Sequence, residues 1–306
     1  MTRSAKTEQT IEVGGVRLTH PGRVLYPEQG LTKADLAAYV AQVAPWMLPH
    51  VADRPLSLLR CPQGEGGACF YQKHFAAGLP EGVKGISIDE KEGPQIYGAV
   101  EDLRGLVALV QIGVLEFHPW GSTIDRLEQP DRLIFDLDPD PALPWSAVIA
   151  GAIELRDLLT SLDLVSFVKT SGGKGLHVVV PVRPRLDWER IKSAAHAIAK
   201  RFAEAAPRRY TVDLAKKARR GRIFVDYLRN SRGQTAVAPY SPRARDGAPV
   251  ATPLTWAEVE AGTRAEKFTV ATLPRRIGRG FKDPWAEMNG LRQPLSAALL
   301  RDLGVT

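Results

Sequence analysis

The chain has 306 residues, of which 44% are hydrophobic and 25% charged, and this balance excludes wholesale disorder. The length allows one large two-lobed domain or two smaller domains. The longest uncharged apolar stretch, Gly105 to Leu115, is too short to span a membrane, and the polar N-terminus leads to no apolar signal region. We therefore expect a cytoplasmic protein without a membrane partner.

The formal net charge is +7, from 41 Lys and Arg against 34 Asp and Glu. The excess is concentrated between residues 183 and 245, where basic residues outnumber acidic ones by more than three to one. Such a segment suits a polyphosphate or nucleic-acid partner, because each neutralised phosphate releases counterions. The alternative is a solvated basic face without a partner.

Only two cysteines occur, Cys61 and Cys69, which excludes a disulfide-framed scaffold and is consistent with a reducing compartment. We expect both to be simple core residues. Together with His74 they lack the paired spacing of a structural zinc site, so the sequence disfavours zinc binding.

The first half of the chain predicts a loose tail over residues 1–10, followed by short elements. Alternation on either side of Gly14-Gly15 predicts a hairpin over 11–18. Thr32 is placed to cap a helix whose apolar residues recur at helical spacing as far as Pro45. Further on, we expect a strand at 56–60, a loop at 64–67, a strand end or turn at 70–74 and a helix at 100–110.

The second half alternates less regularly between strands and helices. Its elements are strands at 133–137, 166–170, 176–180 and 222–228, helices at 145–159 and 188–205, and a proline- and arginine-rich loop at 239–253. Because these elements do not follow a strict βαβ order, an α+β fold is expected rather than a doubly wound parallel sheet.

Two carboxylates, Asp136 and Asp138, end the apolar strand that begins at residue 133. Successive side chains of a strand alternate between faces, so both acids project from one face while the apolar residues fill the other. Like charges held close together are unfavourable without a cation, and a divalent metal is the natural partner. The alternative is that the acids begin a turn in the Asp-Pro-Asp-Pro run at 138–141.

A third acid, Asp226, interrupts the apolar run 223–228. If this strand lies beside the first, the three carboxylates can hold two metal ions, which clamp the attacking and leaving oxygens of a phosphoryl transfer. The alternative is that Asp226 pairs with a nearby arginine.

The segment from Ser171 to His177 is a glycine-rich turn between two apolar runs. Its three glycines let the backbone approach a ligand closely, and Ser171, Lys174 and His177 add donors, which is typical of a triphosphate cradle. It is not a Walker loop, because the spacing differs and a strand follows. A plain hairpin turn is the alternative.

In this order the motifs resemble the polymerase domain of bacterial ATP-dependent DNA ligase D, a branch of the archaeo-eukaryotic primase superfamily used in non-homologous end joining. The resemblance spans residues 15–285 and rests on the Asp-Leu-Asp strand, the Ser-Gly-Gly-Lys-Gly-x-His turn, and 224–230 followed by 238–245. Segments at 24–27, 60–62, 70–74 and 118–120 also fit. It implies a primase-like, two-lobed catalytic core over 11–306, with lobes near 11–125 and 126–306 and mixed or antiparallel sheets flanked by helices.

The resemblance implies roles for the residues that match the family's motifs. Two divalent cations, Mn²⁺ or Mg²⁺, would be bound by Asp136, Asp138 and Asp226. The triphosphate of an incoming NTP or dNTP would be held by Ser171, Lys174 and His177, with the basic positions Arg219, Arg243 and Arg245 near the triphosphate or primer.

The resemblance also implies a DNA-binding set. Its members are the template-stacking pair Phe70 and Tyr71, the neighbouring Lys73, His118, and the 5′-phosphate pocket of Arg23 and Lys33. Arg23 stands where the family has a lysine, so the charge survives but the phosphate geometry differs. For His118, contact with DNA, a core position and a place beside the metal all stay open. The basic run 216–222 is expected to contact phosphate, with a solvated basic loop as the alternative, and 275–279 is a surface patch or a secondary DNA contact.

The activity implied is template-directed nucleotidyl transfer by two-metal chemistry, filling gaps and extending ends in DNA break repair, with ribonucleotides favoured. The implied partners are gapped or broken DNA with a 5′-phosphate, nucleoside triphosphates, ligase and nuclease domains, and a Ku-type end-binding protein, at the nucleoid. The alternatives are a stand-alone primase-polymerase for excision-repair gap filling or priming, and a non-catalytic module that binds DNA ends.

Overall fold

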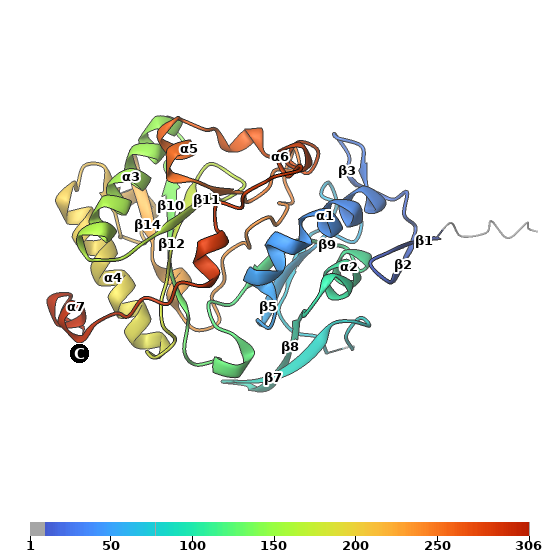
Figure 1. The fold of residues 1–306 in the computed structure, drawn as a ribbon, viewed down its shortest axis with the longest axis horizontal. Helices are drawn as coiled ribbons and strands as arrows, with labels where there is room; N and C mark the ends of the chain where they lie inside the picture. Colours follow the sequence, from blue (N-terminus) through green and yellow to red (C-terminus); the bar gives the residue numbers. More distant parts are fainter. Residues whose placement is uncertain (1–9, 77, 306) are drawn as a thin grey trace, which may run out of the picture.

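The computed structural model describes residues 10–305 with the exception of residue 77. Its strands form a six-stranded and a five-stranded sheet besides two small two-stranded ones, with helices packed around them (Figure 1). The fold is therefore α+β, as the mixed order of elements predicts. The expected tail over 1–10 lies outside the described residues apart from Thr10, the first residue of β1.

The six-stranded sheet has the order β13-β14-β10-β12-β11-β15. All neighbours in it are antiparallel except β13 and β14, which are parallel. The strands are β10 (Arg132–Pro139), β11 (Phe167–Thr170), β12 (Leu176–Pro181), β13 (Tyr210–Thr211), β14 (Ile223–Asp226) and β15 (Pro253–Leu254).

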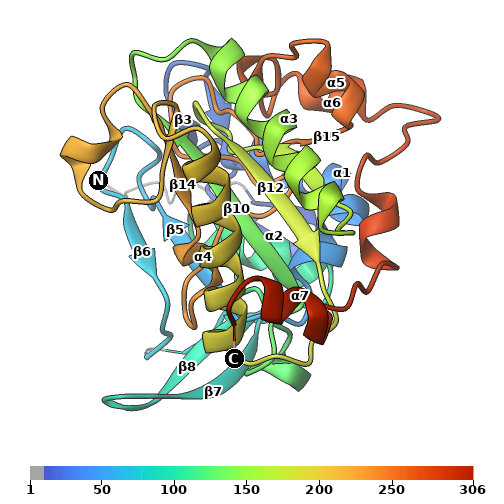
Figure 2. The same ribbon diagram turned by 90° about the vertical axis from the view of Figure 1, so that its left-hand side faces the viewer.

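Helices α3 (Trp145–Ser161) and α4 (Trp188–Ala205) cover one face of this sheet (Figure 2). The alternation of β10 explains which face they cover, because Leu133, Phe135 and Leu137 belong to the core beneath the helices. Asp136 and Asp138 therefore project from the opposite face, which no helix of this pair covers.

The five-stranded sheet is built around β5 (Leu56–Arg60), which pairs with β9 (Val114–Pro119) along one edge. Its other edge pairs with β6 (Phe70–Gln72) and, at Leu56, with β8 (Gly93–Ala99). The hairpin of β8 with β7 (Lys84–Glu90) was not anticipated, because glycine and proline in β8 weaken its strand signal.

Helix α1 (Lys33–Val51) is capped by Thr32, as the sequence predicts, and the Thr32 side chain also forms a capping box with Asp35. The expectation that it ends at Pro45 is wrong, because both Pro45 and Pro49 lie inside it. The helix continues past them since its last two turns bury Met47 and Val51 completely in the core. Tertiary packing here outweighs the loss of two backbone donors.

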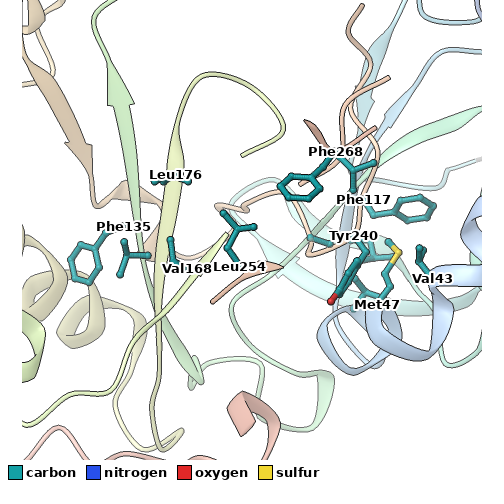
Figure 3. Packing of buried hydrophobic residues seen from close by; sticks show 14 of the residues in the cluster. Val43, Met47, Phe117, Phe135, Val168, Leu176, Tyr240, Leu254 and Phe268 are labelled. Carbon is teal, nitrogen blue, oxygen red and sulfur yellow. The ribbon is translucent and has the colours of Figure 1, made fainter. Parts of the chain in front are cut away.

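The main hydrophobic core is continuous between the two sheets. Figure 3 shows it reaching from Phe135 and Val168 in the six-stranded sheet, through Leu254, to Phe117 on β9 and Met47 on α1. The chain therefore folds around a shared interior rather than around two separate ones.

The remaining elements connect and flank these layers. They are strands β1 (Thr10–Val13), β2 (Val16–Thr19), β3 (Val24–Tyr26) and β4 (Leu31–Thr32), helices α2 (Leu103–Gln111), α5 (Trp256–Glu260), α6 (Leu273–Arg276) and α7 (Ala297–Asp302), and 3-10 turns at Ile124–Arg126, Lys216–Arg219, Leu228–Asn230, Ala265–Lys267 and Ala286–Asn289. Among the described residues, no helix is long and apolar enough to cross a membrane.

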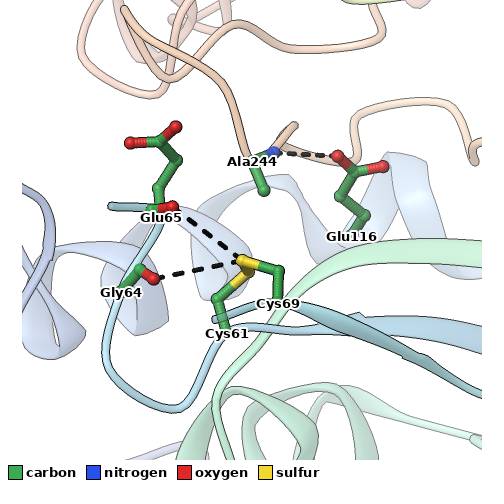
Figure 4. The surroundings of a disulfide bond; sticks show 6 residues. All are labelled: Cys61, Gly64, Glu65, Cys69, Glu116 and Ala244. Carbon is green, nitrogen blue, oxygen red and sulfur yellow. Dashed lines mark hydrogen bonds between the residues drawn. A yellow bond between two sulfur atoms is a disulfide. The ribbon is translucent and has the colours of Figure 1, made fainter. Parts of the chain in front are cut away.

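The two cysteines are joined in a disulfide between Cys61 and Cys69 (Figure 4). The expectation of two simple core residues is therefore wrong: Cys61 is buried, but Cys69 is exposed at the start of β6. The pairing arises because β5 and β6 are antiparallel neighbours, with Arg60 opposite Phe70, so the next residue outward on each strand meets its counterpart.

Candidate active site

A cavity of about 490 Å³ opens on the face of the six-stranded sheet that α3 and α4 leave uncovered. Both sheets contribute to its wall, because side chains of the five-stranded sheet come from β6 and β9. Twelve of the residues proposed from the sequence line it: Asp136, Asp138, Asp226, Ser171, Lys174, His177, Arg219, Arg243, Arg245, Tyr71, Lys73 and His118.

The register of the sheet brings the acidic residues together. Asp136 lies directly opposite Asp226 on β14 and opposite His177 on β12. Asp138 follows two residues later on the same face. The strands that the sequence placed far apart are thus immediate neighbours, and the three carboxylates face one cavity.

Arg229 lies between two of these carboxylates. Its Nη2 is 3.2 Å from Asp136 Oδ2, and its Nε is 3.3 Å from Asp226 Oδ2. The alternative in which Asp226 pairs with a nearby arginine is therefore part of the arrangement. Arg219 stands farther off, with its Nη1 3.8 Å from Asp138 Oδ2.

The three acids differ in their electrostatic surroundings. Burial opposes ionisation of Asp136. Its interactions with His177, and then with the positive charges of Arg229 and Lys169, outweigh burial and hold its pKa below the usual value. Burial raises the pKa of Asp138, and so does the nearby charge of Asp136. The pKa of Asp226 is likewise raised, mainly by burial. Negative charge is thus crowded in this cluster.

The donor set fits a divalent cation in its chemistry, since three carboxylates supply the hard oxygen ligands that Mg²⁺ and Mn²⁺ take. Burial, and after it the charge of Asp136, raises the pKa values of Asp138 and Asp226, and a bound cation would favour their ionised forms. In the described part of the chain, no three His, Cys, Asp or Glu side chains are grouped closely enough to hold an ion as they stand. In this arrangement the Arg229 side chain occupies the space between Asp136 and Asp226.

The glycine-rich turn closes on itself beside the acids. Ser171 N donates to Gly175 O at 3.0 Å, and Gly175 N donates to Ser171 Oγ at 3.3 Å. A Cβ at Gly175 would collide with the carbonyl oxygen of Leu137, so only glycine lets the turn lie this close to the end of β10. Gly172 has a φ of +68°, the left-handed conformation that favours glycine.

Basic side chains surround the turn. Arg243 Nη1 donates to Ser171 O, and Arg245 Nη1 lies against Gly173. Burial, followed by the charge of Lys169, lowers the pKa of His177 to about 4, so its ring is neutral near pH 7. The cavity therefore offers positive charge and donors around a turn next to three carboxylates.

On the β6 side, the structure separates the predicted aromatic pair. Phe70 and Tyr71 are successive residues of a strand and point to opposite faces, so Tyr71 lines the cavity and Phe70 does not. Phe70 instead lies beside Arg60, whose guanidinium carbon is 5.5 Å from its ring centroid. Both rings are exposed, 48% for Phe70 and 59% for Tyr71.

Arg23 and Lys33 lie outside this cavity and flank the β3–β4 hairpin, because Arg23 directly precedes β3 and Lys33 is the first residue of α1. Lys33 N donates to Arg23 O at 2.8 Å, which holds the two residues side by side. The Lys33 ammonium is buried and donates to the carbonyls of Thr19 and Gln111 at 2.9 and 3.2 Å. Arg23 Nη1 donates to Pro62 O at 2.9 Å, in the loop that the disulfide closes.

Two charged residues of the site were missed by the sequence analysis. Arg229 had a local signal, since it follows Asp226 by three residues. Glu116 also had one, because the alternating run 115–118 places Glu116 and His118 on the same face of a strand. Neither sequence pattern indicates which residue the side chain contacts, so no role could be assigned to Arg229 or Glu116 from the sequence.

Comparison with known proteins is consistent with this geometry. Residues 32–285 match the family model described as LigD, primase-polymerase domain. The chain is 41% identical over 293 residues to the multifunctional non-homologous end joining protein LigD of Pseudomonas aeruginosa, covering 95% of this chain and 35% of that protein. It is 30% identical to the bifunctional non-homologous end joining protein LigD of Bacillus subtilis, covering 93% and 46%.

Among solved structures, the chain is similar to the polymerase domain from Mycobacterium tuberculosis ligase D in complex with DNA. The TM-score is 0.83 at 32% sequence identity, and the match covers 90% of this chain and 98% of that one. The chain thus spans nearly all of a solved polymerase domain, but only about a third to a half of the length of the curated relatives.

Proposed function

Because this chain belongs to the family of LigD primase-polymerase domains, which are DNA-directed nucleotidyltransferases, we propose that it extends primer ends and fills gaps during the repair of broken DNA. The observation that carries the proposal is the row of Asp226, Asp136 and His177 across three neighbouring strands, with the glycine-rich turn at its side.

In this proposal the chain's residues divide the work of nucleotidyl transfer. Ser171, Lys174 and the turn amides bind the triphosphate, and Arg243 and Arg245 offset its charge. Asp136, Asp138 and Asp226 would hold the divalent cations, whose chemistry would be to activate the primer hydroxyl and to offset the charge of the leaving pyrophosphate. Tyr71 presents an aromatic face on which a template base can stack, whatever its sequence.

We further propose the finer properties that family membership suggests. These are Mn²⁺ as the working metal, a preference for ribonucleotides, recognition of a 5′-phosphate by Arg23 and Lys33, and a place at the bacterial chromosome beside ligase and nuclease domains and a Ku-type protein. The adjacency of Arg23 and Lys33, joined by the hydrogen bond from Lys33 N to Arg23 O, supports the phosphate site.

The test is extension of a 5′-phosphorylated gapped duplex with ribo- or deoxyribonucleotides and with manganese or magnesium. Asp138→Ala should abolish extension while DNA affinity changes less than about threefold, because it removes a carboxylate but no base or phosphate contact. Asp157→Ala, on the outer helix α3, is the matched control and should extend normally.

Unimpaired synthesis by Asp138→Ala would contradict the proposal. Salt-sensitive DNA binding without any metal-dependent turnover in the unsubstituted protein would favour a non-catalytic end-binding module instead. Synthesis on a template without a primer would favour a stand-alone primase-polymerase.

A further inference from the structure

Glu116 lies in β9, at the boundary between the two lobes, and its side chain is only 2% exposed. A buried carboxylate is unfavourable unless donors surround it, because it loses its hydration. Each donor that Glu116 attracts therefore adopts a defined place relative to the others.

Both oxygens of Glu116 are used, and the donors come from the two lobes. Oε1 accepts from Ala244 N at 2.9 Å, the contact drawn in Figure 4. Oε2 accepts from Arg243 Nε at 2.9 Å and lies 2.8 Å from His118 Nε2. Burial opposes ionisation, but these three partners outweigh it and hold the pKa of Glu116 below its usual value. The carboxylate is thus ionised and can only accept, so His118 Nε2 carries the proton.

One of these partners leads to the nucleotide side of the cavity. The Arg243 guanidinium is held by Glu116 at Nε and by the Ser171 carbonyl at Nη1. Its Cγ also fills the space beside Gly172, where a Cβ could not fit. The position of Arg243 relative to the glycine-rich turn therefore depends on Glu116.

Another partner leads to the template side. The His118 ring meets the Tyr71 ring edge to face, with centroids 5.6 Å apart, and both residues line the cavity. Tyr71 is the exposed aromatic residue to which we assign base stacking. A continuous chain of contacts therefore runs from Tyr71 through His118, Glu116 and Arg243 to the turn at Ser171.

We infer that Glu116 is a positioning residue that sets Arg243 for the triphosphate and His118 for the template side together, so that nucleotide binding and template binding are coupled through one carboxylate. The inference rests on the proposed function, since it takes Arg243 as a triphosphate contact. Coupling of this kind is reciprocal: the factor by which bound template raises the affinity for nucleotide equals the factor by which bound nucleotide raises the affinity for template.

Glu116 is not needed merely to hold the lobes together. Next to it, Phe117 N donates to Ser241 Oγ at 3.0 Å, and Ala238 N donates to Phe117 O at 2.8 Å. Tyr39 OH also donates to Tyr240 O at 2.8 Å. These contacts join the same segments without the carboxylate, so a variant at position 116 should keep the fold.

The test measures primer extension and direct nucleotide binding with Glu116→Gln. The amide nitrogen cannot accept from Arg243 or His118, so we expect the KM for nucleotide to rise about ten- to hundredfold with kcat within about threefold. Glu116→Asp keeps the charge on a shorter side chain, so its KM for nucleotide should lie between those of the unsubstituted protein and Glu116→Gln. The control is Glu260→Gln, which breaks an exposed ion pair with Arg156 away from the cavity.

Double variants distinguish positioning from general damage. When Glu116→Gln is combined with Arg243→Ala, the KM for nucleotide should be at most about threefold higher than with Arg243→Ala alone, because Glu116 acts through Arg243. In the unsubstituted protein, nucleotide should bind more tightly when template-primer is present. In Glu116→Gln, the ratio of nucleotide affinities with and without template-primer should fall to near one.

An unchanged KM, additive losses, or a fall in kcat and melting temperature at constant KM would each overturn the inference. If both Glu116 variants fail to fold, the lobes depend on the carboxylate and the inference is equally overturned. Absence of extension by the unsubstituted protein would instead count against the proposed function, whereas the nucleotide titrations would still decide the role of Glu116.

Discussion

Buried charge occurs at both ends of β10, with different consequences. At its start, Asp131 accepts from both terminal nitrogens of Arg54 and from Arg132 Nε, so its oxygens are saturated. At its end, Asp136 lies 3.2 Å from Arg229 and 3.4 Å from His177 and faces a cavity. The first cluster is thus paired within itself, whereas the second faces the main cavity beside the glycine-rich turn.

Asp131→Asn should lower the free energy of unfolding by about 3–5 kcal/mol at pH 7, because it leaves buried Arg54 without its counter-charge. Burial opposes ionisation of Asp131, but Arg132 and Arg54 outweigh it and hold its pKa below the usual value. A depressed pKa stabilises the fold above the unfolded-state value of about 3.9, and that stabilisation is lost as the pH falls.

Urea denaturation between pH 7 and pH 2 measures both effects. The unsubstituted protein should lose stability steeply below about pH 4, and Asp131→Asn should lose less over the same range. Asp125→Asn, at an exposed position, should match the unsubstituted protein at every pH. Equal acid sensitivity in all three would show that Asp131 is not the group responsible.

Among the elements, the turn between β11 and β12 depends on close backbone approach. Gly175→Ala would place a methyl group against Leu137 O and push the turn away from the end of β10. We expect the KM for nucleotide to rise at least about tenfold, since the triphosphate donors move relative to the acids. Gly22→Ala, at a glycine with open space around it, should leave extension kinetics unchanged.

The loop closed by Cys61–Cys69 is a second element whose stability can be tested. It connects β5 to β6, and Glu65 N donates to Leu25 O within it, so it also joins β3. With a sequence separation of 8, the crosslink should stabilise the fold by roughly 2–3 kcal/mol, because it lowers the conformational entropy of the unfolded chain. Calorimetry with and without reductant should show a lower melting temperature on reduction and no shift in the Cys61→Ser, Cys69→Ser double variant.

For the whole molecule, the positive charge is arranged asymmetrically. Lys216 and Lys217 lie in the segment that leads into β14, whereas Lys192 and Lys200 lie on α4, over the opposite face of the sheet. The first pair lies between Leu214 and Arg219, which line the cavity, so we expect a phosphate backbone bound along the cavity to pass nearer the first pair than the second.

Replacing Lys216 and Lys217 by Gln should therefore weaken DNA binding and reduce the slope of log affinity against log salt by about 2. The same change at Lys192 and Lys200 should leave the slope unaltered. Fluorescence anisotropy with a gapped duplex between about 50 and 200 mM salt measures both. Equal slopes for the two double variants would mean that DNA does not follow the face we propose.

The local sequence was sufficient to determine the α+β class, the Thr32 cap of α1, the bounds of α4 and the common face of Asp136 and Asp138. Each follows from the period of a few neighbouring residues or from a cap. It was not sufficient to determine that α1 continues past Pro45 or that Phe70 turns away from the cavity, since these depend on what packs against each element.

Only the tertiary structure decided that Asp226 stands opposite Asp136, that Arg229 lies between them, that Cys61 meets Cys69, and that Glu116 joins Arg243 to His118. Strand neighbours here come from segments tens of residues apart. A short-range pattern encodes the face that a side chain takes, whereas its partner is selected by the packing of the complete chain.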